Sequence, residues 1–159
     1  MKLLERLLKT IVLPKQISAF EHTYLRRVNR IALVFFLLHI PFFVAVAAFN
    51  DTGPLLAGVL TSLVVVGPVL ATVALRNPRA VSLVFGFTAM LMGGLLVHFG
   101  QGPMQIEMHF YFFATLAMLA VFANPLVVIL AAATVGAHHL IFWFVLPRAS
   151  STTRRRSGW

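Results

Sequence analysis

The stretch Ile31–Phe49 reads IALVFFLLHIPFFVAVAAF and contains no Asp, Glu, Lys or Arg. A helix rises about 1.5 Å per residue, so a run of this length can cross the roughly 30 Å hydrocarbon core of a bilayer. Arg26, Arg27 and Arg30 come directly before it, where lipid headgroups would lie. The stretch therefore predicts a membrane-spanning helix, and it decides the fold class.

Four more apolar runs follow, separated by short polar turns, at Pro54–Leu75, Ala80–Phe99, Met104–Ala123 and Pro125–Leu146. Each has about the 20 residues that a spanning helix needs. We therefore expect an all-α, polytopic helical membrane bundle with about five transmembrane helices. Residues 1–17 predict an amphipathic helix lying in the interface, residues 18–147 the bundle, and residues 148–159 a basic tail.

Two local signals predict where helices begin. Ser18 followed by Glu21 has the form of a capping box, which places a helix start near Ala19. Asn124 followed by Pro125 has the form of an N-cap with proline in the first helical position.

The distribution of charge predicts the orientation in the membrane. The net charge is +9, with 13 Lys and Arg against four acidic residues. If the N-terminus is inside, nine basic residues lie inside and four outside, which the positive-inside rule favours. Basic residues of this kind orient helices and contact anionic lipid, so we expect the lipid bilayer, and not nucleic acid, as the partner. The absence of cysteine excludes disulfides, thiolate sites, iron–sulfur clusters and covalently attached haem.

Five of the six histidines lie inside the apolar runs: His39, His98, His109, His138 and His139. An ionisable side chain in hydrocarbon is costly, so each is a candidate functional residue. With the predicted orientation, all five fall in the outer half of the bilayer. By helix rise, His109 lies roughly 9 Å and His139 roughly 12 Å below the outer end of its helix. These two match best in depth, with His39 next and His98 nearer the surface.

Two histidines at one level on facing helices are what a b-type haem requires, and imidazole is also a ligand for copper and zinc. Gly94 lies one turn from His98 and Gly136 three residues before His139, so both glycines could leave room for a macrocycle. His138 and His139 are about 100° apart on a helix, so at most one faces a given partner. Glu107 could hydrogen-bond to a ligating imidazole and orient it, or it could equally be a solvated residue at the mouth of its helix. A histidine inside a membrane often forms only a hydrogen bond between helices, and for His98, near the surface, this alternative has equal weight.

Three functions remain open on this basis. The first is haem b binding in a sensory or redox-relay module. The second is binding of copper or another metal ion, for which Met108 beside His109 is the strongest signal. The third is an accessory subunit of a larger membrane complex, with structural histidines. The sequence shows no nucleophile–base set, paired carboxylates or phosphate loop, so we do not expect an enzyme.

The segments Ile106–Phe113, Ala137–Leu140 and Val145–Pro147 carry a resemblance to a known family. Together with Leu38–Pro41 and Val97–Gly100, they resemble the multi-span N-terminal sensor region of bacterial methyl-accepting chemotaxis proteins. Similar regions precede diguanylate cyclases and histidine kinases.

The resemblance implies a sensory module of the bacterial inner membrane that binds haem b through intramembrane histidines. It carries over to His39, His98, His109 and His139, and more weakly to His138. The chain departs from the family where His109-Phe110-Tyr111 stands in place of His-Phe-His, so Tyr111 is at most a second-layer residue. A sixth span and an output domain are also missing, so we expect a truncated or stand-alone module that works with a homo-oligomeric or membrane-complex partner.

Overall fold

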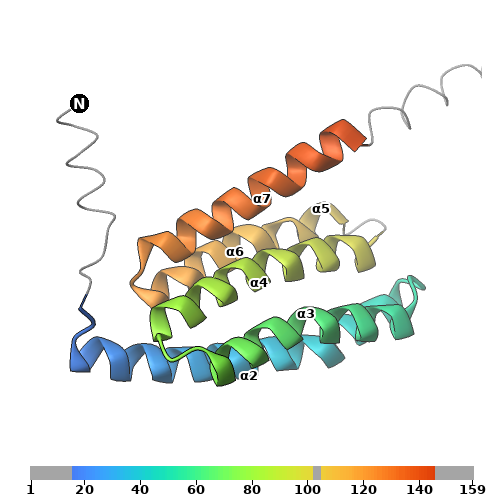
Figure 1. The fold of residues 1–159 in the computed structure, drawn as a ribbon. Helices are drawn as coiled ribbons and strands as arrows, with labels where there is room; N and C mark the ends of the chain where they lie inside the picture. Colours follow the sequence, from blue (N-terminus) through green and yellow to red (C-terminus); the bar gives the residue numbers. More distant parts are fainter. Residues whose placement is uncertain (1–15, 102–104, 146–159) are drawn as a thin grey trace, which may run out of the picture.

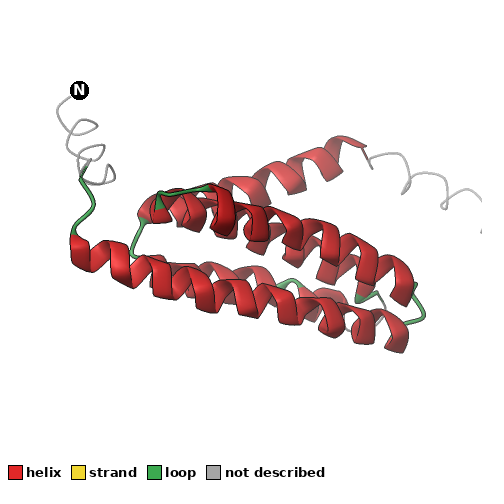
Figure 2. Cartoon of the chain, turned by 60° about the horizontal axis from the view of Figure 1, so that its bottom comes forward, coloured by secondary structure: helices red, strands yellow, loops and turns green. Residues whose placement is uncertain are grey.

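The computed structural model describes residues 16–101 and 105–145, which are helical apart from short turns (Figures 1 and 2). The elements are α2 (Ala19–Phe49), α3 (Pro54–Ala74), α4 (Pro78–Phe99), α5 (Gln105–Met108), α6 (Phe110–Leu119), the 3-10 turn η1 (Ala120–Phe122) and α7 (Pro125–Val145). The interfacial helix expected over residues 1–17 falls almost wholly outside the described residues, and so does the basic tail.

Among the described residues, four helical segments are long and apolar enough to cross a membrane: α2, α3, α4 and the segment Gln105–Phe122. The last is built from α5, α6 and η1, and α7 adds a further apolar helix. The predicted all-α membrane bundle is therefore confirmed. The helix boundaries agree with the predicted runs to within a few residues because each boundary coincides with a local turn or cap signal.

The predicted helix starts are set by side-chain caps. The Ser18 hydroxyl accepts a 3.1 Å hydrogen bond from the Glu21 N–H, and α2 begins at Ala19. The Asn124 side-chain oxygen accepts one of 3.0 Å from the Leu126 N–H at the start of α7. The third apolar helix begins at Pro78 instead of the expected Ala80, since the Asn77 side chain also acts as a cap.

The fourth span is broken where the sequence predicts one continuous helix. His109 separates α5 from α6. Its ring nitrogen Nδ1 donates to the Gln105 carbonyl at 3.0 Å, and its backbone N–H bonds instead to the Ile106 carbonyl at 3.1 Å. At this point a tighter backbone bond to the third residue back replaces the regular α-helical bond to the Gln105 carbonyl.

Helix α4 lies at the centre of the bundle. More than half of its most apolar window, 56%, is buried, against 22–28% in the other spanning segments. Stacked rings of Phe36, Phe85 and Phe122 join α2, α4 and η1, with ring centres 5.6 and 6.2 Å apart. At Gly86 a side chain would overlap Val127, so this glycine allows the start of α7 to approach α4 closely.

Helix α7 diverges from the bundle towards its C-terminal end (Figure 1). Its early residues Val127 and Ala131 are fully buried, whereas Leu140 and Trp143 are 61% and 77% exposed. The second half of α7 is therefore more exposed than the first.

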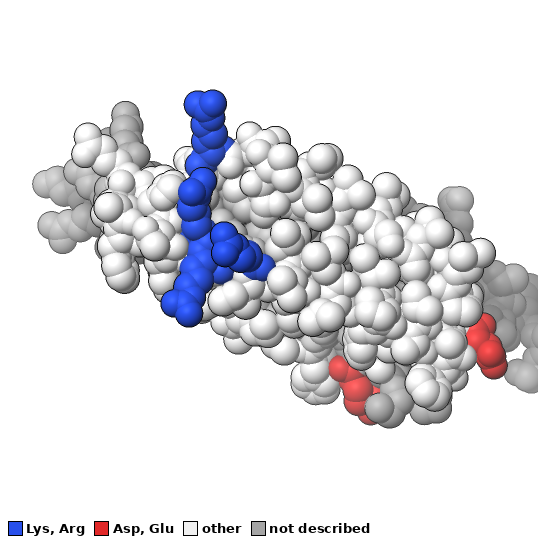
Figure 3. Space-filling view, turned by 90° about the horizontal axis from the view of Figure 1, so that it is seen from below, with Lys and Arg blue, Asp and Glu red and all other residues white. Residues whose placement is uncertain are grey.

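Apart from Glu21, which pairs with Arg79, the basic and acidic residues that the structure describes lie at opposite ends of the molecule (Figure 3). The described basic residues are Arg26, Arg27, Arg30, Arg76 and Arg79, and all belong to the end where α2 and α4 begin. Asp51 and Glu107 belong to the opposite end, where the Thr52 hydroxyl bonds to the Phe99 carbonyl at 2.8 Å. This separation is the pattern that the positive-inside rule describes.

Candidate functional site

His39 and Tyr111 form a polar pair between α2 and α6. The His39 Nδ1 lies 2.7 Å from the Phe35 carbonyl, and the Tyr111 hydroxyl lies 2.7 Å from the His39 Nε2. A carbonyl only accepts, so Nδ1 carries the hydrogen and Nε2 accepts from the Tyr111 O–H. His39 is 6% exposed and is surrounded by the rings of Phe35, Phe36 and Phe43. Both nitrogens of this predicted ligand are therefore engaged within the bundle.

His109 lies at the break between α5 and α6, with an exposed ring. Its Nδ1 is fixed on the Gln105 carbonyl, so Nε2 is the nitrogen that can accept a hydrogen bond or bind a metal. In the described part of the chain, this Nε2 has no hydrogen-bond partner.

His139 on α7 repeats this arrangement. Its Nδ1 lies 2.8 Å from the Val135 carbonyl, its ring is exposed, and Nε2 has no partner among the described residues. The ring of Phe112 joins the two sites, because its centre lies 6.4 Å from the His109 ring and 6.1 Å from the His139 ring. The pair predicted from depth therefore shares one aromatic neighbour.

Phe112 itself is held in place by α4. It is 6% exposed, and a side chain on Gly93 would overlap its ring. Gly93 therefore provides the space into which Phe112 packs.

The two predicted glycine patches differ in the structure. A Cβ on Gly94 would lie 3.5 Å from Cε1 of His138, so the His138 ring fills the space beside Gly94. A Cβ on Gly136 would meet nothing within 4 Å. Of the two spaces predicted for a macrocycle, one is therefore occupied by His138 and the other is open.

His98 and Glu107 are both exposed near the same end of the bundle. The His98 ring packs 4.9 Å from the ring of Phe99. Glu107 makes no hydrogen bond or ion pair within residues 16–101 and 105–145, so its predicted second-layer role has no contact that supports it. Met108 packs against Gly100, with its sulfur 3.3 Å from the position of a Cβ there.

The candidate metal ligands His39, His98, His109 and His139 do not form one cluster. Among the described residues, no group of three or more His, Cys, Asp or Glu side chains is placed to hold a metal ion. A closed structural metal site usually needs four such ligands. What these residues offer instead is a pair of separate imidazoles around Phe112.

The sequence interpretation missed a basic cavity at the other end of the bundle, between α2, α3 and α4. The sequence predicted that Arg26 and Arg30 orient the helix and contact anionic lipid, but it did not predict a cavity between them. Their spacing of four residues, which places them on one face of α2, was the available signal. Arg76 is brought to them only by the packing of the helices.

No family model matches the chain, and neither a curated protein nor a solved structure shows significant similarity to it. The resemblance to chemotaxis sensor regions stays a prediction from the residues that carry it.

Proposed function

We propose that this membrane protein binds haem b through His109 and His139 and acts as a sensory or redox-relay module. The observation that carries the proposal is that these two imidazoles have the same hydrogen-bonding pattern. They come from separate helices, lie against one ring, and each has Nδ1 fixed on a backbone carbonyl and Nε2 unpartnered among the described residues. A carbonyl bonded to Nδ1 fixes the tautomer and makes Nε2 a better ligand.

The number of ligands supports haem over a bare metal ion. Axial ligation of haem needs one or two protein nitrogens, because the porphyrin supplies the other four. A protein zinc site usually has three or four protein ligands, and the described residues offer no group of three His, Cys, Asp or Glu side chains. The predicted copper ligands would also require Met108, which is engaged in packing against Gly100.

The surroundings of the pair suit a large apolar cofactor. The second half of α7 is exposed and apolar, and Gly136 leaves open space three residues before His139. When bound, haem would supply a one-electron redox centre. The chain's own residues would set the imidazole tautomers, exclude water and hold α6 in place through the His39–Tyr111 bond. We place this module in the bacterial inner membrane, where it would act with a further membrane partner.

The absorption spectrum of the purified full-length protein tests the proposal, together with haem content per protein. His109→Ala and His139→Ala should each lose most of the haem. His22→Ala is the matched control, because His22 lies in the first turns of α2, at the opposite end, and should keep the wild-type content. If His109→Ala and His139→Ala both keep the wild-type haem content, this ligand pair is wrong. The pair is also wrong if the wild-type protein takes up no added haem.

A structural role in a larger membrane complex is the second candidate. The engagement of both His39 nitrogens favours it, since at least this histidine acts as a bond between helices. A protein that folds and stays in the membrane without haem, and co-purifies with one partner, would support this role over the first.

A further inference from the structure

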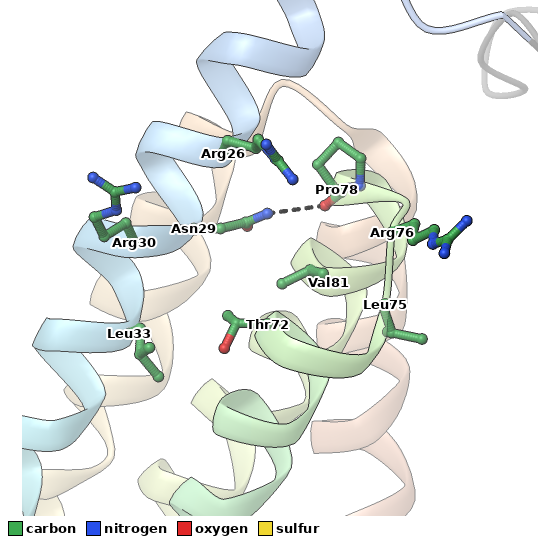
Figure 4. Close-up of a pocket in the computed structure, with 9 residues that line it drawn as sticks. All are labelled: Arg26, Asn29, Arg30, Leu33, Thr72, Leu75, Arg76, Pro78 and Val81. Carbon is green, nitrogen blue, oxygen red and sulfur yellow. Dashed lines mark hydrogen bonds between the residues drawn. The ribbon is translucent and has the colours of Figure 1, made fainter.

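A cavity of about 360 Å³ lies at the basic end of the bundle, between α2, α3 and α4. Figure 4 shows its lining, which consists of Arg26, Asn29, Arg30, Leu33, Thr72, Leu75, Arg76, Pro78 and Val81. Ligand pockets in proteins usually begin at about 300 Å³, so the cavity has room for a small group.

Three arginines give this cavity an uncompensated positive charge. Arg26 extends from α2 towards the start of α4, while Arg30 and Arg76 lie on opposite sides with their guanidinium groups turned outwards (Figure 4). None of the three has an acidic partner in the part of the chain that the structure describes. Glu21, the acidic residue described at this end, is bonded to Arg79 at 2.5 and 2.6 Å. The cavity therefore attracts an anion.

The other polar groups around the cavity are already bonded. The Asn29 amide donates to the Pro78 carbonyl at 3.0 Å, and the Thr72 hydroxyl donates to the Val69 carbonyl at 2.7 Å. The first N–H groups of α4 bond to Asn77. A bound anion would thus be held by the guanidinium groups, whose planar donors match phosphate oxygens in pairs.

The position of the cavity relative to the membrane surface indicates where the anion comes from. Arg30 is followed at once by the apolar run Ile31–Phe49, so the mouth lies at the level of lipid headgroups. Leu33, Leu75 and Val81 give the lining an apolar part beside the arginines. This combination fits a phosphate joined to an acyl chain better than a free ion. Basic pockets between membrane helices are known to hold anionic headgroups.

We propose that this cavity binds the phosphate of an anionic phospholipid, with Arg26 as the principal contact and Arg30 and Arg76 adding positive charge on either side of it. The proposal is independent of haem binding, which concerns the opposite end of the bundle.

The test uses the full-length protein extracted from vesicles of phosphatidylcholine and phosphatidylglycerol, with the retained lipids counted by native mass spectrometry. Wild type should retain phosphatidylglycerol in preference to phosphatidylcholine. Arg26→Gln should lower this preference about tenfold, because it removes charge-assisted hydrogen bonds to the phosphate, and adding Arg76→Gln should lower it further. Arg26→Lys keeps the charge, so its preference for phosphatidylglycerol should fall less than that of Arg26→Gln. If Arg26→Gln does not fold, Arg26→Lys still tests the contribution of the guanidinium group.

Arg27→Gln is the matched control, because Arg27 is the next residue on α2, is exposed and does not line the cavity. Its lipid preference should equal that of wild type. An equal loss in Arg27→Gln and Arg26→Gln would mean that general surface charge, and not the cavity, selects the lipid. A second arm adds inorganic phosphate: if it displaces phosphatidylglycerol in an Arg26-dependent way at millimolar concentration, the site is one for free phosphate and the phospholipid assignment is wrong.

Discussion

The Tyr111 hydroxyl donates a 2.7 Å hydrogen bond to Nε2 of His39, across 72 positions of sequence and between α2 and α6. In a membrane, where water cannot replace the lost partner, such a bond fixes one helix against another. Its presence changes the expected role of His39 from a haem ligand to a structural residue, and this difference can be measured.

Tyr111→Phe should destabilise the folded protein by about 1 kcal/mol, because it leaves the buried Nε2 without a donor. Unfolding in mixed micelles measures the change. A double-mutant cycle with His39→Phe isolates the bond, and a coupling energy near zero would show that the two side chains are neighbours without a stabilising interaction.

The haem content of His39→Ala tests whether the hydrogen bond to Tyr111 keeps His39 from binding haem. Because Nε2 of His39 already accepts from Tyr111, this variant should keep the wild-type haem content per folded protein, in contrast to His109→Ala. If His39→Ala loses as much haem as His109→Ala does, His39 is a haem ligand.

Gly93 and Gly136 should respond oppositely to a methyl group. Gly93→Ala places a Cβ within the ring of buried Phe112, so we expect destabilisation of about 1–3 kcal/mol despite the better helix propensity of alanine. Gly136→Ala meets nothing within 4 Å and should be neutral or slightly stabilising. Chemical unfolding of the two variants side by side is the measurement, and equal destabilisation would contradict the packing described for Phe112.

A leucine at Gly136 separates packing from cofactor binding. If haem lies beside His139, Gly136→Leu should lower haem content while the protein without haem keeps its stability, because that space is open in the structure. Undiminished haem content would place the haem away from this face of α7.

The Glu21–Arg79 ion pair should make stability depend on pH. The hydrogen bond from Arg79 holds the pKa of Glu21 below its usual range. The stabilisation from this ion pair is therefore fully present above the pKa of Glu in the unfolded chain, which is about 4.3. It is lost as the pH falls through the lower pKa that Glu21 has in the folded protein. We expect a difference of up to about 1 kcal/mol between neutral and acidic pH, since the pair is partly exposed.

Comparison of Glu21→Gln with wild type in unfolding experiments at several pH values measures this contribution. The variant should show a flatter pH dependence. Glu107→Gln is the control, because Glu107 is exposed and has no ion-pair partner among the described residues. A pH dependence that Glu21→Gln leaves unchanged would mean that the pair contributes nothing.

Reporter fusions test the orientation. A fusion after Asn77 should report the cytoplasm and one after Gly53 the outer side, because the described arginines lie together at the Asn77 end. A fusion after Arg148 should also report the outer side. A cytoplasmic signal from that last fusion would contradict five crossings.

The sequence by itself determined the features that depend on neighbouring residues. The apolar runs predicted the spanning helices, and Ser18 and Asn124 predicted two helix starts that the structure confirms. These signals are local: hydropathy depends on a window of residues, and a capping side chain bonds to a backbone N–H two or three positions away.

Only the tertiary structure decided which side chains meet. Ser18 caps α2 as predicted, yet the Glu21 carboxylate bonds to Arg79, 58 positions away, and not back to the helix start. In the same way His138 fills the space beside Gly94, and Tyr111 engages His39. Helical periodicity predicts which residues share a face, but the neighbour of that face depends on how helices rotate and pack together. In an apolar bundle many packings satisfy the same hydropathy, so these contacts cannot be derived from the order of residues alone.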